Sequence, residues 1–291
     1  MFTRKRKTKL ASFLQLIRFD KQIGTVLLFV PCFISILFAS EQVNYRLVLL
    51  FALGSFVMRS AGCVINDILD KEFDRKVSRT KNRPLASQMI EVWQAWLLFV
   101  VLLVIGFLVL LQLNFLTILL GLLVVVPIIL YPLMKRFFWY PQIFLGFVFN
   151  WGVLMAWTAV TETISVDALL LYFGFVCLTV AYDTIYGHQD VKDDLRLGLK
   201  STAIMFRSYN KIIIEALYII FIVSQVYVGF KHGVGLLYFV MLNLVGIVIL
   251  YKVEILNLLK TKECSCFFQL NGKILVLLVF VIYLDKYLLV I

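Results

Sequence analysis

The chain has few charged side chains for its 291 residues. Asp, Glu, Lys and Arg make up 15% of it, while 62% of the residues are hydrophobic and the mean hydropathy is +0.96. This balance excludes a soluble globular domain, because its surface would carry too few polar side chains to stay in water. Histidine occurs only twice, which excludes a histidine-based metal site, and the five cysteines form no zinc or disulfide pattern.

The apolar residues are concentrated in nine long runs with few or no charges. About 20 residues in a helix cross a bilayer, and a helix satisfies the backbone polar groups that lipid cannot. We therefore expect an all-α integral membrane protein with about nine transmembrane helices, in a single polytopic domain over residues 1–291. The runs are 23–38, 47–58, 96–111, 115–133, 143–160, 168–181, 212–230, 234–251 and 274–284.

Two further expectations concern the N-terminal segment and the C-terminal part of the chain. Residues 10–21 are predicted to form a helix in the membrane interface, with Phe13, Leu14, Leu16 and Ile17 facing lipid. The pair Cys264 and Cys266 is predicted to lie in a loop before the last run, where both cysteines serve as small hydrophobic side chains.

The basic residues follow a topology pattern that explains the net charge of +11. They cluster in the N-terminus and in the loops after the second, fourth, sixth and eighth runs, at 71–83, 135–136, 192–211 and 252–262. Because positive loops stay on the cytoplasmic side, we expect a cytoplasmic N-terminus and no nucleic-acid partner. The basic N-terminus is too short for an organelle transit peptide, so we expect a multi-pass protein of a bacterial inner membrane.

The acidic residues follow a different pattern. Eight of the 17 fall in two short segments, and the first begins as the second predicted helix leaves the membrane. Asp67, Asp70 and Asp74 are spaced i, i+3 and i+7, so one helical face carries all three, and Asn66 joins that face. Orientation in the membrane does not require such clustering of acids, which indicates a separate function.

The second acidic segment lies at the end of the sixth predicted helix. Asp183, Asp190 and Asp194 are spaced i, i+7 and i+11, which again places them on one helical face. Four helices separate the two segments, so both emerge on the same side of the membrane. An acid at the end of an apolar helix, such as Asp183, is costly and typical of a functional site.

Two facing groups of carboxylates favour a hard cation such as Mg²⁺, which prefers oxygen ligands and shares them with a substrate phosphate. Nearby cations would then contact the remaining phosphate oxygens. The competing interpretation is a pair of solvated charged loops, which explains neither the matched spacing nor the matched position at helix ends. The candidate phosphate-binding cations are Lys71, Arg75, Arg79, Lys81, Arg83, Lys192 and Lys200.

At these residues the sequence resembles the UbiA family of membrane aromatic prenyltransferases, and within it the 4-hydroxybenzoate polyprenyltransferases of ubiquinone synthesis. The resemblance covers nearly the whole chain. Two departures are Lys71, where arginine is common, and the less acidic run 190–194. The matching stretches are 18–25, 66–74, 79–85, 131–136, 182–194 and 198–202, including Asn66-Asp67-x-x-Asp70-x-x-x-Asp74 and Tyr182-Asp183-Thr184-x-Tyr186-x-x-x-Asp190-x-x-x-Asp194.

The resemblance implies nine helices around a central cavity that opens to the lipid bilayer. It also implies Mg²⁺-dependent transfer of a polyprenyl group from polyprenyl diphosphate to the ring of 4-hydroxybenzoate, ortho to the hydroxyl. An allylic diphosphate leaves when cations stabilise its developing charge, and the carbocation needs an apolar, aromatic-lined cavity without water. The residues at hand therefore support the same chemistry independently of the resemblance.

The resemblance and the residue chemistry together predict roles for individual residues. Arg136 is predicted to hold the benzoate carboxylate as a planar bidentate donor, and Arg59 inside the second helix to face the cavity. The predicted metal ligands are Asp67, Asp70, Asp74, Asp183, Asp190 and Asp194. The predicted catalytic residues are Asp70, Asp74, Asp190, Asp194 and Arg136. The predicted substrate-binding residues are Asn66, Lys135, Arg79, Arg83, Lys200, Arg18, Arg59 and Tyr186.

Two alternatives stay open. The aromatic acceptor could be a naphthoate, a homogentisate or a haem, although the stretch 131–136 favours 4-hydroxybenzoate. An ion-coupled membrane transporter also has acids within its helices. In this chain, however, the acids sit at helix ends among clustered cations, and Mg²⁺-dependent release of diphosphate would separate an enzyme from a transporter. The prenyl chain length cannot be derived from these residues.

Overall fold

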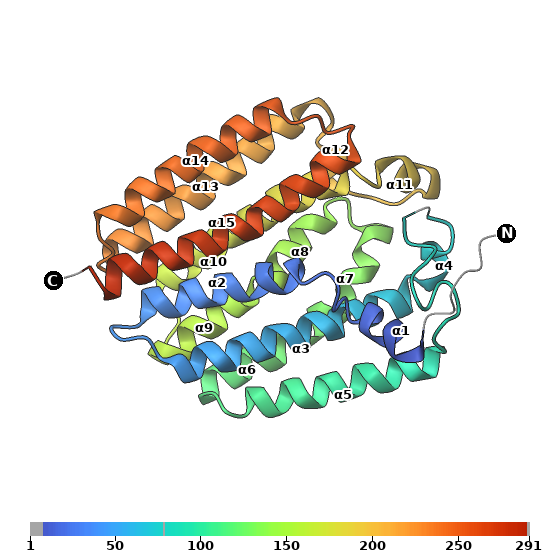
Figure 1. Cartoon of the computed structure of the whole chain (residues 1–291), viewed down its shortest axis with the longest axis horizontal. Coiled ribbons are helices and arrows are strands. Elements are labelled where there is room, and N and C mark those ends of the chain that lie inside the picture. Colours follow the sequence, from blue (N-terminus) through green and yellow to red (C-terminus); the bar gives the residue numbers. More distant parts are fainter. Residues whose placement is uncertain (1–7, 78, 290–291) are drawn as a thin grey trace.

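The computed structural model describes residues 8–77 and 79–289, except for the side chain of Lys135. Over this part of the chain every regular element is a helix (Figure 1). The helices are α1 (Lys9–Leu16), α2 (Ile23–Ala39), α3 (Tyr45–Leu69), α4 (Lys71–Asp74), α5 (Val92–Leu110), α6 (Phe115–Leu123), α7 (Val125–Phe137), α8 (Pro141–Phe149), α9 (Trp151–Thr161), α10 (Val166–Gly187), α11 (Val191–Leu197), α12 (Thr202–Met205), the 3₁₀ helix η1 (Arg207–Tyr209), α13 (Asn210–Lys231), α14 (Leu236–Ile255) and α15 (Thr261–Tyr287).

Eight helical segments in the described residues are long and apolar enough to cross a membrane. The 17-residue α2 adds a shorter apolar helix, so the prediction of an all-α membrane protein with about nine apolar helices is confirmed. Two of the eight segments consist of two α-helices each, since α6 continues into α7 and α8 into α9.

The bends inside these two segments were not predicted. Pro127 lies just after the α6–α7 junction and has no N–H to donate to the carbonyl of Leu123, which explains the first bend. At the second bend the side chain of Asn150 donates to the carbonyl of Gly146 at 2.9 Å. Both bends lie within membrane-length segments, where freed backbone groups must find partners inside the protein.

Helix α10 lies at the centre of the bundle and is the most thoroughly buried of the candidate spans (Figure 1). Its buried side chains belong to the largest apolar cluster, together with side chains of α2, α9, α13, α14 and α15. A second cluster joins α1, α3 and α5. Because α3 and α10 carry the two acidic segments, the packing of the bundle fixes where each segment emerges.

The structure contradicts the prediction that 10–21 forms an interfacial helix with its apolar side facing lipid. Helix α1 ends at Leu16, which is fully buried, and Phe13 and Ile17 pack against the same cluster. Only Leu14 is exposed as expected. The reason is that Leu85 and Ile90, far along the chain, fold over the end of α3 and enclose the apolar face of α1.

The predicted last run, 274–284, is too short. Helix α15 begins at Thr261, so Cys264 and Cys266 lie in a helix and not in a loop. Lysines, a glutamate and a glutamine in its first half lower the hydropathy and hide the helix from a search for apolar runs. Cys264, Phe267 and Asn271 form the buried side of this half.

The second acidic segment is not one continuous helical face, contrary to the prediction from its spacing. Helix α10 ends at Gly187, the chain turns through Asp190, and α11 begins at Val191. The first segment runs nearly as predicted, since Asp67 lies in α3, Asp70 follows it and Asp74 ends α4.

Close packing of α10 on α13 depends on Gly174. A Cβ atom added there would lie 1.8 Å from Oγ and 2.7 Å from Cβ of Ser224. We expect Gly174→Ala to lower the free energy of unfolding by about 1–3 kcal/mol, the usual range for overpacking, measured by thermal unfolding of the purified protein in detergent. Gly54→Ala is the matched control, because its Cβ would meet only Val109 at 3.7 Å. Equal melting temperatures for the two variants would contradict the account of α10–α13 packing.

Candidate active site

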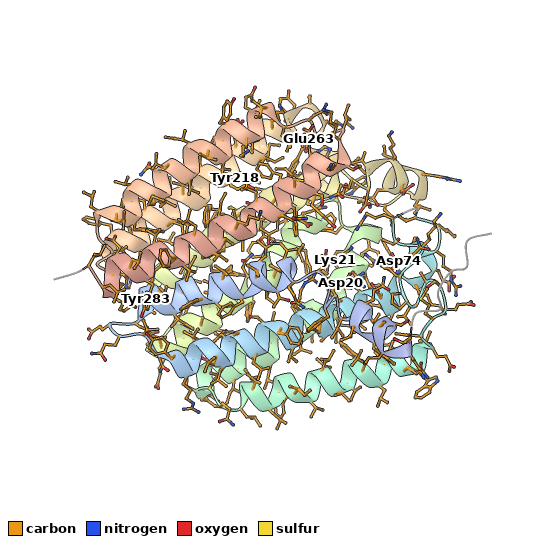
Figure 2. The ribbon with its side chains drawn as sticks, viewed as in Figure 1. Asp20, Lys21, Asp74, Tyr218, Glu263 and Tyr283 are labelled. Atoms are coloured by element: carbon orange, nitrogen blue, oxygen red, sulfur yellow. The ribbon has the colours of Figure 1, made fainter. Side chains whose placement is uncertain are left out.

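A cavity of about 890 Å³ lies inside the bundle, lined by residues of α1 to α11 and of α15. One part of its wall is polar and holds both acidic segments, and the rest is apolar. The polar part includes Asn66, Asp67, Asp70, Asp74, Asp183, Asp190 and Asp194. Asp20 and Lys21, which also line the cavity, and Asp74 lie toward the same end of the molecule, while Tyr283 lies at the opposite end (Figure 2).

Two arginines meet the carboxylates of Asp67 and Asp74 in the first segment. Nη2 of Arg18 donates to Oδ1 of Asp67 at 2.6 Å. Nη1 of Arg83 lies 3.1 Å from the same oxygen and 2.8 Å from Oδ2 of Asp74, so Arg83 joins α3 to α4. Burial raises the pKa of the Asp74 carboxyl above its ordinary value, and the Arg83 guanidinium offsets part of that rise.

A third arginine joins the loop after the first segment to the second segment. The guanidinium of Arg79 binds the carboxylate of Asp190 through two hydrogen bonds, of 2.8 and 2.5 Å. Its Nη1 also donates to the hydroxyl of Tyr186 at 3.4 Å. Burial alone would lower the pKa of Arg79, but the Asp190 carboxylate outweighs burial and the pKa is raised. The two acidic segments are therefore held together across 111 residues of sequence.

Arg136 and Arg59 differ in what surrounds them. Nη2 of Arg136 donates to the carbonyl of Leu69 at 2.9 Å and lies 3.3 Å from Oδ1 of Asp70, and the guanidinium lies over the ring of Phe73. Arg59 also lines the cavity, and its side chain forms no hydrogen bond or ion pair with any residue that the structure describes. A Cβ on Gly24 would lie 2.5 Å from its Nε, so the missing side chain makes room for the guanidinium.

The other predicted substrate-binding residues differ in their placement. Lys200 does not line the cavity, since its Nζ donates to the carbonyl of Phe137 at 3.0 Å and lies over the ring of Trp139. The side chain of Lys135 lies outside the described part of the chain. Tyr186 lines the cavity beside Arg79, as expected of a residue near substrate.

An aromatic wall beside the second segment includes a residue that the sequence did not reveal. Phe268 lines the cavity, with its ring centroid 5.4 Å from that of Tyr182 and 4.5 Å from that of Tyr186. The sequence pattern does not identify Phe268 as a site residue, because it lies in the polar first half of α15. Only the fold brings this half against α10, so no local pattern could have found it.

The donor atoms around the polar wall are carboxylate oxygens, which suit Mg²⁺. In the residues that the structure describes, no three His, Cys, Asp or Glu side chains lie close enough to form a metal cluster by themselves. This agrees with the usual Mg²⁺ site, where one or two carboxylates share the ion with substrate phosphates and water. One buried carboxylate oxygen, Oδ2 of Asp67, accepts no hydrogen bond from the described residues.

Removal of Arg83 tests the electrostatic account of this wall. Arg83→Ala leaves the buried Asp74 carboxylate without its ion pair, and we expect a loss of about 3 kcal/mol in the free energy of unfolding. Adding Asp74→Asn to this variant should recover part of the lost free energy of unfolding, because it removes the unpaired charge. The measurement is the melting temperature in detergent.

Lys260→Ala is the control for Arg83→Ala, because Lys260 pairs with Glu263 at an exposed site where a pair is worth about 1 kcal/mol or less. If both single variants melted at the same temperature, the ion pairs of Arg83 would not stabilise the wall.

Comparison with known proteins gives a consistent result. Residues 28–278 match the model of a family described as the UbiA prenyltransferase family. The chain is 39% identical over 264 residues to the mitochondrial 4-hydroxybenzoate polyprenyltransferase of Drosophila pseudoobscura pseudoobscura, an alignment that covers 89% of this chain and 66% of that protein. It is 44% identical over 239 residues to the 4-hydroxybenzoate octaprenyltransferase of Actinobacillus pleuropneumoniae serotype 3 (strain JL03), covering 82% of each.

Solved structures show the same fold. The apo structure of a UbiA homolog from Aeropyrum pernix K1 matches with a TM-score of 0.78 and 24% identity, covering 88% of this chain and 97% of that one. The structure of a UbiA homolog from Archaeoglobus fulgidus bound to GPP and Mg²⁺ matches with a TM-score of 0.71 and 16% identity, covering 94% and 99%.

Proposed function

The chain belongs to the UbiA prenyltransferase family, and we propose that it transfers a polyprenyl group from polyprenyl diphosphate to the ring of 4-hydroxybenzoate, ortho to the hydroxyl, in ubiquinone biosynthesis. The observation that carries the proposal is one cavity with two kinds of wall. Its polar wall holds both acidic segments and the four arginines that pair with them, and most of the remainder is apolar and aromatic. The names of the two relatives at 39% and 44% identity support the acceptor.

The polar wall is the proposed site of the diphosphate. Asp67, Asp70 and Asp74 from one side and Asp183, Asp190 and Asp194 from the other would hold Mg²⁺. Bound there, the metal would stabilise the negative charge of the departing diphosphate. Asn66, Arg18, Arg79 and Arg83 supply donors for the remaining phosphate oxygens. The Mg²⁺ in the Archaeoglobus fulgidus homolog supports a divalent cation in this fold.

The apolar wall is the proposed site of carbon–carbon bond formation. When the bond from the prenyl carbon to the diphosphate oxygen breaks, its electron pair leaves with the diphosphate, and an allylic cation remains. The acceptor ring carbon attacks this cation, and the ring then loses a proton. Tyr182, Tyr186 and Phe268 exclude water from the cation, which water would otherwise convert to a prenol.

We assign the acceptor carboxylate to Arg59 in preference to Arg136. The guanidinium of Arg136 already binds Leu69 and Asp70, which suits it to orient Asp70 in the metal site. The Arg59 side chain has no such partner among the described residues. It lies in the cavity near enough to Tyr131 and Tyr182 for electrostatic interaction, as does Asp183. A cation in such surroundings needs an anion, and the carboxylate of 4-hydroxybenzoate supplies one.

The direct test is to give the purified chain 4-hydroxybenzoate, Mg²⁺ and prenyl diphosphates of several lengths, and to identify the products by mass spectrometry. We expect 3-prenyl-4-hydroxybenzoate and an equal amount of released diphosphate, both abolished by chelation of the metal. If only naphthoate or only homogentisate gave a product, that compound would replace 4-hydroxybenzoate as the proposed acceptor. If no aromatic acceptor received a prenyl group, the function would be refuted.

Removal of one metal-binding carboxylate tests the donor site. We expect Asp70→Asn and Asp190→Asn each to abolish turnover while the protein stays folded, because each removes an anionic oxygen ligand without changing side-chain size. Asp193→Asn is the matched control, since Asp193 lies in the same segment but does not line the cavity. Near-normal prenylation by either site variant, in protein with a wild-type melting temperature, would refute its assigned role.

Steady-state kinetics with a varied acceptor concentration separate the two arginines. A hydrogen-bonded charge is worth about 1.5–3 kcal/mol, so Arg59→Ala should raise the acceptor KM roughly tenfold to a hundredfold. The same variant should leave the prenyl diphosphate KM unchanged. Arg136→Ala should instead lower kcat, because its target is Asp70. The opposite pattern would return the carboxylate to Arg136.

A further inference from the structure

Three buried polar side chains form a continuous hydrogen-bonded chain from the α8–α9 bend to the cavity. Nδ2 of Asn150 donates to Oγ1 of Thr179 at 2.8 Å, and Oγ1 of Thr179 lies 3.0 Å from the hydroxyl of Tyr182. All three are at most 3% exposed. Tyr182 alone lines the cavity, directly before Asp183 of the second acidic segment.

The bend at Asn150 is what allows the chain to form. Asn150 ends α8 and precedes α9, and its Nδ2 also donates to the Gly146 carbonyl at 2.9 Å. At Gly146 helix α8 approaches α10 so closely that a Cβ would lie 3.1 Å from the carbonyl oxygen of Val176. Nδ2 of Asn150 therefore binds both its own helix, at Gly146, and α10, at Thr179.

Tyr182 is consequently held at two points. Its hydroxyl is bound by Thr179, and its ring packs edge-on against Phe268. Tyr182 has only two side-chain torsions, so these contacts fix the position of its ring beside Asp183. Hydrogen bonds between membrane helices stabilise folds by about 0.6 kcal/mol on average. If the network were purely structural, removing one of its hydrogen bonds would therefore lower stability slightly and leave the reaction products unchanged.

We propose that Asn150 and Thr179 are positioning residues for prenyl transfer, which act by fixing Tyr182. This inference rests on the proposed function. Held in place, the Tyr182 ring covers the allylic cation and excludes water, and its hydroxyl oxygen is kept from the cation. If released, that oxygen could form an ether with the prenyl carbon, while the diphosphate keeps the electron pair of the broken bond and the phenol proton passes to solvent. Water entering in place of the ring would form a prenol in the same way.

The test measures how the prenyl group is partitioned. Purified wild-type protein and the variants Thr179→Val and Asn150→Leu receive geranyl diphosphate, Mg²⁺ and saturating 4-hydroxybenzoate. Geraniol, prenylated acid and prenylated protein are then quantified by mass spectrometry. We expect the ratio of geraniol and protein adduct to prenylated acid to rise about tenfold in both variants, since an ångström of misplacement changes rates by up to about a hundredfold. The diphosphate KM should not change.

Two further variants separate positioning from folding. Thr158→Val is the matched control, because Thr158 is as deeply buried as Thr179 and its hydroxyl lies 2.9 Å from that of Thr117, outside the network that holds Tyr182. It should lower the melting temperature as Thr179→Val does and leave the partition at the wild-type ratio. In a Tyr182→Phe background, which removes the hydroxyl from the network, Thr179→Val should have no additional effect on the geraniol ratio, because coupled residues are not additive.

The outcomes are distinct. If wild-type protein prenylates the acid and Thr179→Val does so with the wild-type ratio, the positioning role is overturned and the network is structural only. The same conclusion follows if Thr158→Val shifts the ratio equally. If the wild type forms no prenylated acid with geranyl diphosphate or with any longer prenyl diphosphate, the proposed function fails, and this inference fails with it.

Discussion

Arginine–aspartate pairing is the interaction on which the site depends. In a chain with so little charge, the carboxylates of the two acidic segments lie at the ends of apolar helices, where an unpaired charge is costly. Arg18, Arg83 and Arg79 meet them at hydrogen-bond distance, and the pair Arg79–Asp190 connects segments that lie far apart in the sequence. The two segments are therefore held over one cavity, and the same guanidinium groups are donors that a diphosphate would need.

The rest of the cavity follows a different physical rule. There the wall consists of apolar and aromatic side chains, and the buried polar groups within it are bound to one another, as in the chain from Asn150 through Thr179 to Tyr182. Arg59 is the exception, since it has no hydrogen-bond partner among the described residues. This division suits the proposed function, in which the polar wall would take the diphosphate, the apolar wall the carbocation, and Arg59 the acceptor carboxylate.

Much of this arrangement could be predicted from the sequence because its signals are local. Apolar runs predict the membrane helices, and the spacing of Asp67, Asp70 and Asp74 predicts one acidic face. The burial of α1, the contact of Asn150 with Thr179 and the position of Phe268 could not be predicted, since each joins residues distant in the chain. The end of α10 at Gly187 also could not be predicted from spacing alone, because Asp190 is held from outside by Arg79.

Both acidic segments are proposed to bind one metal–diphosphate complex. The most direct measurement uses Mn²⁺, an oxygen-binding substitute for Mg²⁺, with inorganic diphosphate and the purified protein, and detects phosphorus coupling to bound Mn²⁺ by electron paramagnetic resonance. The account predicts bound, phosphorus-coupled Mn²⁺ in the wild type and its loss in both Asp74→Asn and Asp194→Asn, one from each segment. Wild-type binding and coupling in either variant would contradict the account, because one segment would then suffice.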